Sequence, residues 1–104
     1  MNLDSHIKSC YVAGHNGMVG SAIVRLLKTK YPLIKIITYS KNELDLTNQK
    51  DVNEFLRDKK PQLVFIAAAK VGGIYKNMTY PADFLYENMM IQNNIIHACY
   101  TNKI

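Results

Sequence analysis

The sequence predicts an α/β fold in which a parallel sheet is covered by helices on both faces. Short apolar runs alternate with longer mixed segments in the order β-α-β-α-β-α. The third run, 63–68, contains only apolar residues, as a strand buried on both faces requires. A glycine-bearing segment follows the first run and leads directly into a helical pattern. We therefore expect one domain over residues 1–104, with three parallel strands and flanking helices.

The first half of the chain holds two expected strands and the helix between them. The first strand is expected over 7–13. Four apolar residues then lie at helical spacing: Ala22, Ile23, Leu26 and Leu27. Tyr31-Pro32 ends this helix, because proline disfavours the helical conformation in the residue before it. The β-branched residues of 34–39 then predict the second strand.

The second half continues the alternation after a turn at 40–42. Thr47 or Asn48 can cap a helix that ends at Lys60-Pro61. Its expected inner face consists of Val52, Phe55 and Leu56. The third strand is expected over 63–68, and a long helix over 82–100.

The helix over 82–100 has apolar residues on more than one stripe. These residues are Phe84, Leu85, Met89, Met90, Ile91, Ile95, Ile96 and Cys99. We expect two buried faces, one of which packs on the sheet. The other face meets a partner subunit or a missing part of the chain, or else the whole helix is buried inside one domain.

Composition and charge exclude several classes of function. The net charge is +5, but the basic residues are spread along the chain, so we expect no nucleic-acid partner. The longest apolar run, 63–69, is too short to cross a bilayer, and the N-terminal residues lack the apolar core of a secretory signal. Cys10 and Cys99 match no metal spacing, so we expect reduced packing residues, no metal and a cytoplasmic location.

The segment from Val12 to Ser21 contains a GxxGxxG pattern between a strand and a helix, the context of a dinucleotide-binding Rossmann fingerprint. Gly14 allows a sharp turn, Gly17 a close approach of the backbone to a pyrophosphate, and Gly20 close packing of helix and sheet. Phosphates then face the first amides of the helix, without the lysine of a P-loop. A glycine-rich turn without a ligand remains the alternative.

The end of the second strand indicates which dinucleotide is bound. The hydroxyl of Ser40 and the ammonium of Lys41 suit a 2′-phosphate, and no carboxylate stands there to accept from a 2′-hydroxyl. NADP(H) is therefore favoured over NAD, although Lys41 could be only a solvated turn charge. Asp45-Leu46 could hydrogen-bond the adenine edge, or Asp45 could cap the next helix.

Three segments resemble one known family: GHNGMVGSAI (14–23), AAAKVGGI (67–74) and YPADFLYENMMIQNNIIHA (80–98). They resemble the GDP-L-fucose synthases, which are extended short-chain dehydrogenases/reductases, and the resemblance covers the whole chain. It implies a homodimeric enzyme that uses NADPH to convert GDP-4-keto-6-deoxy-D-mannose to GDP-L-fucose. The homodimer is expected to form through the helix over 82–100.

The resemblance also implies which residues contact the cofactor. They are Gly14, His15, Asn16, Gly17, Met18, Val19 and Gly20 of the loop, Lys41, Asn42, Glu43, Leu44, Asp45 and Leu46 after the second strand, and Ala67, Ala68 and Ala69 beyond the third. Lys41 stands where relatives tend to carry an arginine, so it keeps the charge but loses the bidentate fork. His15 is expected to orient the loop or the cofactor.

No catalytic residue is assigned. The family's chemistry needs a Ser-x-Cys segment, a Tyr-x-x-x-Lys pair on a later helix and a substrate domain, and none of these can be placed in 1–104. The Tyr-x-x-x-Lys at Tyr31 and Lys35 straddles Pro32, and Met90 follows Tyr86 at the same spacing. We expect the chain alone to be inactive, because no activated phenol can donate a proton to the carbonyl.

Two interpretations remain open. The chain is the N-terminal, cofactor-binding part of such an enzyme, in which case the nucleotide sugar binds only to a complete chain. Alternatively, it is a non-catalytic half-Rossmann module. A fragment is expected to leave the first strand without its neighbour, and the exposed edge favours aggregation or pairing. A module should be soluble and unfold cooperatively.

Overall fold

The computed structural model describes residues 3, 5–68 and 81–104. Its elements are β1 (Ser9–Ala13), α1 (Met18–Lys30), β2 (Lys35–Ile37), α2 (Gln49–Lys59), β3 (Leu63–Ile66) and α4 (Pro81–Thr101). Their order confirms the predicted β-α-β-α-β-α alternation. None of the helices among these residues is long and apolar enough to span a membrane.

The three strands form one parallel sheet in the order β2-β1-β3. The expectation that the first strand lacks a neighbour is wrong: α1 carries the chain to one side of β1, and α2 returns it to the other side. The open edges are therefore those of β2 and β3. All three strands are shorter than predicted: β1 begins at Ser9, and β2 and β3 end at Ile37 and Ile66, where the chain passes into loops.

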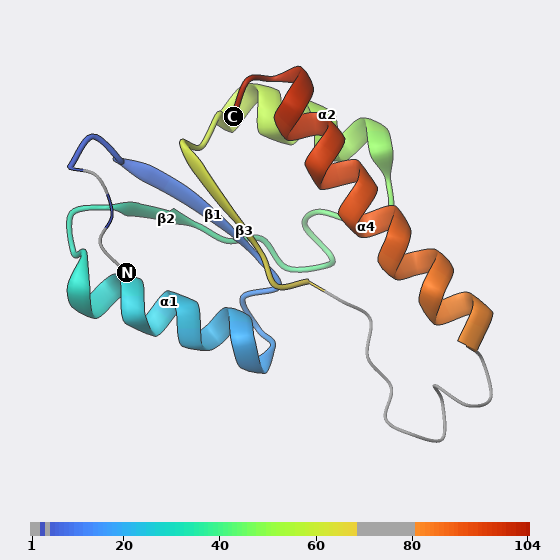
Figure 1. Ribbon diagram of the computed structural model, residues 1–104, viewed down its shortest axis with the longest axis horizontal. Coiled ribbons are helices and arrows are strands. Elements are labelled where there is room, and N and C mark those ends of the chain that lie inside the picture. The colour runs from blue at the N-terminus through green and yellow to red at the C-terminus, as the bar shows by residue number, and fades with distance from the viewer. Residues whose placement is uncertain (1–2, 4, 69–80) are drawn as a thin grey trace.

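Helices cover both faces of the sheet, as predicted: α1 lies on one face, and α2 and α4 lie on the other (Figure 1). The core on the α1 face is built on Cys10, Val12 and Leu27. The core on the opposite face is built on Tyr11, Ala13, Ile37, Leu44, Val52, Leu56, Ile91, Ile95 and Ala98. Alternate β1 residues serve the two cores because successive strand side chains point to opposite faces.

The N-terminus of α2 is capped by Asn48 and not by Thr47. The Asn48 side chain accepts a hydrogen bond from the Asp51 amide at 3.1 Å. The helix ends at Lys60, whose left-handed conformation (φ 42°) stops the helical pattern before Pro61, as predicted.

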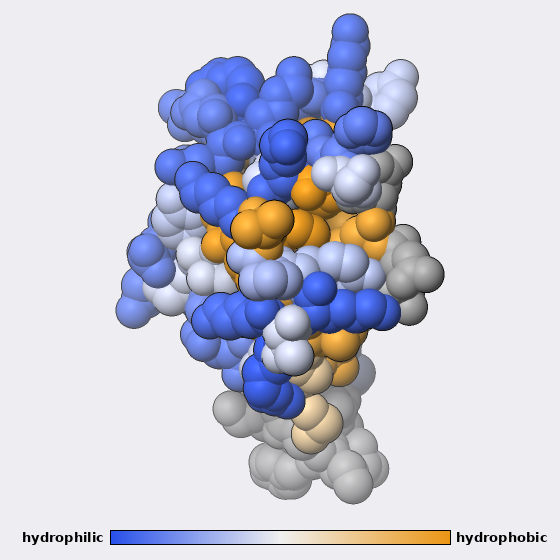
Figure 2. Space-filling view, turned by 90° about the vertical axis from the view of Figure 1, so that its left-hand side faces the viewer, coloured by the Kyte–Doolittle hydropathy of each residue, from blue (hydrophilic) through white to orange (hydrophobic). Residues whose placement is uncertain are grey.

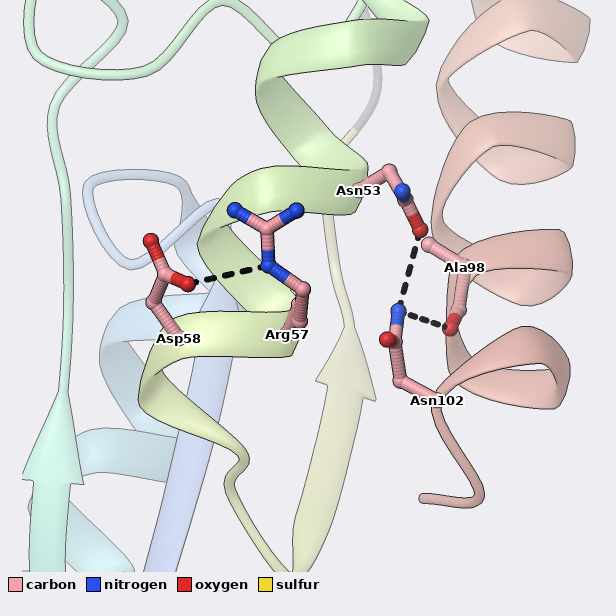
Figure 3. A network of polar contacts seen from close by, with 5 residues as sticks. All are labelled: Asn53, Arg57, Asp58, Ala98 and Asn102. Atoms are coloured by element: carbon pink, nitrogen blue, oxygen red, sulfur yellow. Dashed lines mark hydrogen bonds and ion pairs between the residues drawn. The ribbon is translucent and has the colours of Figure 1, made fainter.

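A polar contact joins the middle of α2 to the C-terminal end of α4 (Figure 3). The Asn102 side-chain nitrogen donates to the Asn53 side-chain oxygen at 3.0 Å and to the Ala98 carbonyl at 2.8 Å. The side-chain amide of Asn102 thus links α2 to α4. The pair Arg57 and Asp58 in the same view is exposed (3.1 Å), so it contributes little to stability.

Only one face of α4 is buried within this chain. Phe84, Ile91, Ile95 and Ala98 face the core. A second apolar stripe, here called the outer stripe, is exposed: Leu85, Met89, Ile96 and Tyr100. The alternative in which the whole helix is buried inside one domain is therefore wrong for the part of the chain that the structure describes.

The amino ends of β1 and β2 lie at the end of the molecule seen in Figure 2. Hydrophobic residues gather near the centre of this face, with hydrophilic residues above them, to their left and below them. Leu33, in the turn between α1 and β2, is 96% exposed. Nearby, the Tyr31 hydroxyl accepts a hydrogen bond from the Leu3 amide at 3.1 Å.

Candidate dinucleotide site

The candidate site lies at the opposite end of the sheet, where all three strands end. β1 leads into the loop 14–17, β2 into the segment 38–48, and β3 into Ala67 and Ala68. After β1 the chain continues through α1 to β2 on one side of β1, and it returns through α2 to β3 on the other side. The crevice at the carboxyl end of β1 is therefore a topological switch point. In α/β sheets, ligands bind at such points.

The backbone at Gly14 and Gly20 has no room for side chains. Gly14 has φ +85°, and a Cβ atom there would lie 2.7 Å from backbone atoms of Ala67 and Ala68. A Cβ atom on Gly20 would lie 1.9 Å from the Gly14 carbonyl oxygen. Gly20 thus allows the helix to pack on the loop itself, where the sequence predicted packing on the sheet. A Cβ atom on Gly17 would meet only ordinary contact, at 3.5 Å.

The N-terminus of α1 opens toward this crevice. Gly17 is the N-cap of α1 and has no side chain that could accept a hydrogen bond from the first-turn amides. The first turn contains no acidic residue. The Gly17 amide donates to the Gly14 carbonyl (3.1 Å), which closes the loop. First-turn amides that lack side-chain acceptors, together with the positive end of the helix dipole, suit an anion.

A cavity of about 380 Å³, here called the main cavity, lies between the loop, the segment after β2, the end of β3 and α4. It brings together ten residues predicted to contact a cofactor: Gly14, His15, Asn16, Gly17, Lys41, Leu44, Asp45, Leu46, Ala67 and Ala68. Five others do not line it: Met18, Val19, Gly20, Asn42 and Glu43. Ala69 lies outside the described residues.

The predicted residues that do not line the cavity have other positions. Met18 and Val19 are exposed at the start of α1, and Gly20 is buried beneath the loop. The Glu43 carboxylate accepts a hydrogen bond from the Ser40 amide at 2.9 Å, and this bond lowers the pKa of Glu43. Glu43 therefore stabilises the turn after β2, while Asn42 is exposed within it.

The cavity also contains residues that the predicted set lacks. Tyr39, Ser40 and Thr47 border the predicted segment, and Ser40 is the residue predicted to bind a 2′-phosphate together with Lys41. Glu87 and Ile91 come from α4, about forty residues later in the chain. The spacing that places Ile91 in the core could have indicated this face of α4, but no motif marks Glu87.

Asp45 is held by its own turn. Its carboxylate accepts hydrogen bonds from the Thr47 hydroxyl at 2.7 Å and the Thr47 amide at 3.0 Å, and these bonds lower the pKa of Asp45. The alternative in which Asp45 caps α2 is wrong, because Asn48 does so. A second cavity of about 390 Å³ adjoins this turn and shares Lys41, Asp45, Thr47 and Glu87 with the main cavity.

Metal chemistry finds no support in this part of the molecule. Within residues 3, 5–68 and 81–104, no three His, Cys, Asp or Glu side chains gather as a candidate metal site. Cys10 is buried and Cys99 half-buried, and both are free thiols whose pKa is raised by burial.

Comparison with known proteins identifies the family. The model of the NAD dependent epimerase/dehydratase family matches residues 10–104. The chain is 51% identical to a putative GDP-L-fucose synthase 2 of Arabidopsis thaliana, and 47% identical to GDP-L-fucose synthase of Escherichia coli. Each match covers 90% of this chain, but 28% and 29% of the relative, respectively.

Solved structures agree with this assignment. MlghC, a GDP-mannoheptose C4 reductase from Campylobacter jejuni with NADP bound, is 39% identical and superimposes with a TM-score of 0.86 over 93% of this chain and 30% of its own. The chain thus spans less than a third of the length of these relatives. It belongs to the NAD dependent epimerase/dehydratase family.

Proposed function

We propose that this chain is the cofactor-binding part of an NADPH-dependent GDP-L-fucose synthase, which converts GDP-4-keto-6-deoxy-D-mannose to GDP-L-fucose. The observation that carries the proposal is the backbone at Gly14 and Gly20, which excludes side chains and opens the N-terminus of α1 toward the main cavity. The 45–51% identity to several proteins named GDP-L-fucose synthase supports this substrate.

The residues present fit a dinucleotide. The first-turn amides of α1 bind the pyrophosphate, which can approach the backbone closely because glycine at position 17 has no side chain. Ser40 and Lys41 bind the 2′-phosphate, which favours NADPH, and the NADP bound by MlghC supports this choice. The remaining predicted contacts, including those of Met18, Val19, Asn42, Glu43 and Ala69, are part of the proposal. When bound, the cofactor supplies a hydride to the substrate carbonyl.

We propose that the Tyr-x-x-x-Lys pair of this chain does not donate the proton to that carbonyl. Tyr31 follows α1 and Lys35 begins β2, so this Tyr-x-x-x-Lys pair lies at the amino ends of the strands, across the sheet from the main cavity. The pair shares no helix face. We therefore propose that this chain alone does not turn over substrate.

We also propose a homodimer through α4. The outer stripe, Leu85, Met89, Ile96 and Tyr100, is apolar and exposed on one side of a 21-residue helix. Such a stripe suits antiparallel packing against the same helix of a second copy. Sedimentation velocity should detect a dimer that Met89→Lys dissociates; a monomer at micromolar concentration contradicts this part.

We also propose a cytoplasmic location, which the free thiols of Cys10 and Cys99 support.

Calorimetric titration tests the cofactor assignment. The 104-residue chain should bind NADPH about tenfold more tightly than NADH, because the 2′-phosphate adds charged hydrogen bonds. Equal affinities would contradict the assignment of Ser40 and Lys41. Absence of binding would contradict the proposed function as a whole.

A chimera separates the enzyme from the alternative of a non-catalytic binding module. The 94 residues of this chain that align with the Escherichia coli synthase at 47% identity replace the corresponding segment of that synthase. NADPH-dependent formation of GDP-L-fucose is expected. A chimera that is folded and binds NADPH, yet forms no product, favours the binding module.

A further inference from the structure

The turn between α1 and β2 presents an apolar side chain to solvent. The Ile34 amide donates a hydrogen bond to the Tyr31 carbonyl at 3.1 Å, which closes a turn with Pro32 and Leu33 at its tip. Leu33 is 96% exposed, more than any other large apolar residue that the structure describes. Turn tips usually carry Gly, Asn, Asp or Ser, and a single exposed leucine is ordinary on a protein surface. The surroundings of Leu33 distinguish it.

The positive charge of the chain is concentrated in its first part. Residues 5–42 contain six Lys or Arg residues and no Asp or Glu, whereas residues 43–104 contain seven of each kind. Asp4, the acidic residue that precedes this stretch, lies outside the described residues. The cations of 5–42 therefore find no acidic partner within their own segment.

Exposed lysines cross the amino end of the sheet. The Lys35 amide donates a hydrogen bond to the Lys8 carbonyl at 2.9 Å, which holds the starts of β1 and β2 side by side. On the other side of β1, the Gln62 amide donates to the Ser9 carbonyl at 3.1 Å, so the chain that follows α2 reaches the same end. The exposed lysines here, together with one in the last turn of α1, are called the lysine rim: Lys8, Lys28, Lys35 and Lys60.

The lysine rim and Leu33 lie at the end of the molecule opposite to the main cavity, which is formed at the carboxyl ends of the strands. Figure 2 shows this end, where hydrophobic residues gather near the centre and hydrophilic residues lie above, to the left and below. Asp58, two residues before Lys60, pairs with Arg57 at 3.1 Å. This end therefore combines positive charge with exposed apolar surface, and it faces away from the candidate site.

The composition of this end favours a lipid surface over other anionic partners. Protein interfaces are depleted of lysine and use arginine and aromatic anchors instead. A nucleic acid would bind the lysines through its phosphates, but it would gain nothing from an exposed leucine. At an anionic bilayer, buried apolar area and attraction to the headgroups both contribute, and long lysine stems allow their ammonium groups to stay at headgroup level.

We propose that the amino end of the sheet binds the surface of an anionic phospholipid bilayer. Leu33 inserts between the headgroups, and the lysine rim lies against their phosphates and carboxylates. Such binding requires neither a membrane-spanning helix nor a dinucleotide, so it is independent of the proposed function. In this orientation the main cavity faces the aqueous phase and stays open to soluble ligands.

Co-sedimentation with vesicles tests the role of charge. The chain should bind phosphatidylcholine vesicles that contain about 30 mol% phosphatidylserine, and it should not bind vesicles of phosphatidylcholine alone. Lys35→Gln should lower the partition coefficient about fivefold, the size expected for one lysine near an anionic surface. Lys50→Gln is the matched control, because it removes the same charge from an exposed residue in the first turn of α2. It should lower the coefficient less than about twofold, since salt screens distant charges.

Tryptophan fluorescence tests insertion. The chain contains no tryptophan, so Leu33→Trp supplies a single reporter. Its emission should shift to shorter wavelengths on anionic vesicles, and brominated lipids should quench it. Leu85→Trp, in the outer stripe of α4, places the same reporter on the other exposed apolar surface and should show neither effect. Urea unfolding verifies that each variant is folded under the conditions of the assay.

The possible outcomes are distinct. Absence of binding to anionic vesicles overturns the inference, and so do equal losses in Lys35→Gln and Lys50→Gln, since charge would then act without a defined surface. A shift confined to Leu85→Trp assigns lipid binding to the outer stripe instead. If soluble poly-glutamate binds the chain and Leu33→Ser weakens that binding while vesicles do not bind, the partner is an acidic protein segment. NADPH titration without vesicles tests the proposed function separately, because it involves the opposite end of the sheet.

Discussion

The loop 14–17 and the segment 39–47 border the same cavity, but backbone atoms determine the shape of the loop and side chains that of the segment. In the loop, the backbone alone sets the geometry, because carbonyl and Cα atoms occupy the space where side chains at Gly14 and Gly20 would lie. In the segment, side chains form the turns, through hydrogen bonds from Ser40 to Glu43 and from Thr47 to Asp45. Side chains at Gly14 and Gly20 should therefore not be tolerated, whereas the segment should allow changes that alter ligand selection.

The largest effect is expected at Gly20. Gly20→Ala places a Cβ atom 1.9 Å from the Gly14 carbonyl oxygen, so the loop or the helix must shift, at a cost of roughly 3 kcal/mol or more in the free energy of unfolding. Gly17→Ala meets only a 3.5 Å contact, so it should cost less than about 1 kcal/mol. Urea unfolding measures both. Similar losses in the two variants would contradict a backbone-determined loop.

A selective effect is expected at Lys41. Lys41→Ala should weaken NADPH binding about tenfold and leave NADH binding unchanged, because it removes a charged partner of the 2′-phosphate only. Lys35→Ala removes the same charge at the amino end of β2 and serves as the control. If Lys41→Ala weakens both cofactors equally, Lys41 only attracts anions to the site and does not select between them.

The smallest effect is expected at Asp45. Its pKa is lowered by the Thr47 hydroxyl and amide, so ionised Asp45 stabilises the fold above the ordinary carboxyl range. This stabilisation is lost as the pH falls through the lowered pKa. The gain in stability is small because the group is exposed. Thr47→Val should raise the Asp45 pKa toward its usual value in a carbon-13 NMR titration. An unchanged pKa would assign the lowering to the backbone amide at position 47 or to the charge of Lys41, and not to the hydroxyl.

Local patterns predicted most of the backbone. The breaker at Pro32, the β-branched run after it and the pair Lys60-Pro61 marked element ends that the structure confirms to within a few residues. The strand ends were predicted too long, because apolar residues continue past the point where a neighbouring strand can pair with them. Thr47 and Asn48 could not be separated by sequence, since both are good caps, and only the turn of Asp45 assigns Thr47 to another partner.

Non-local arrangement was harder to predict. The apolar pattern over 82–100 predicted two apolar faces, but not which of them the chain itself covers. The central place of β1 depends on the direction of each crossover, which no local pattern encodes. Glu87 reaches the cavity only because Ile91 and Asn94 hold α4 against the segment after β2.

The sequence by itself determined the parallel α/β architecture and the glycine loop at the first strand-helix junction. Both follow from short-range rules: apolar runs without alternation require burial on two faces, and glycine alone fits a backbone that other atoms approach closely. Only the tertiary structure decided which side chains share the cavity and which face of α4 is left exposed. Those outcomes depend on packing between segments tens of residues apart, where each contact is possible only after the other elements are in place.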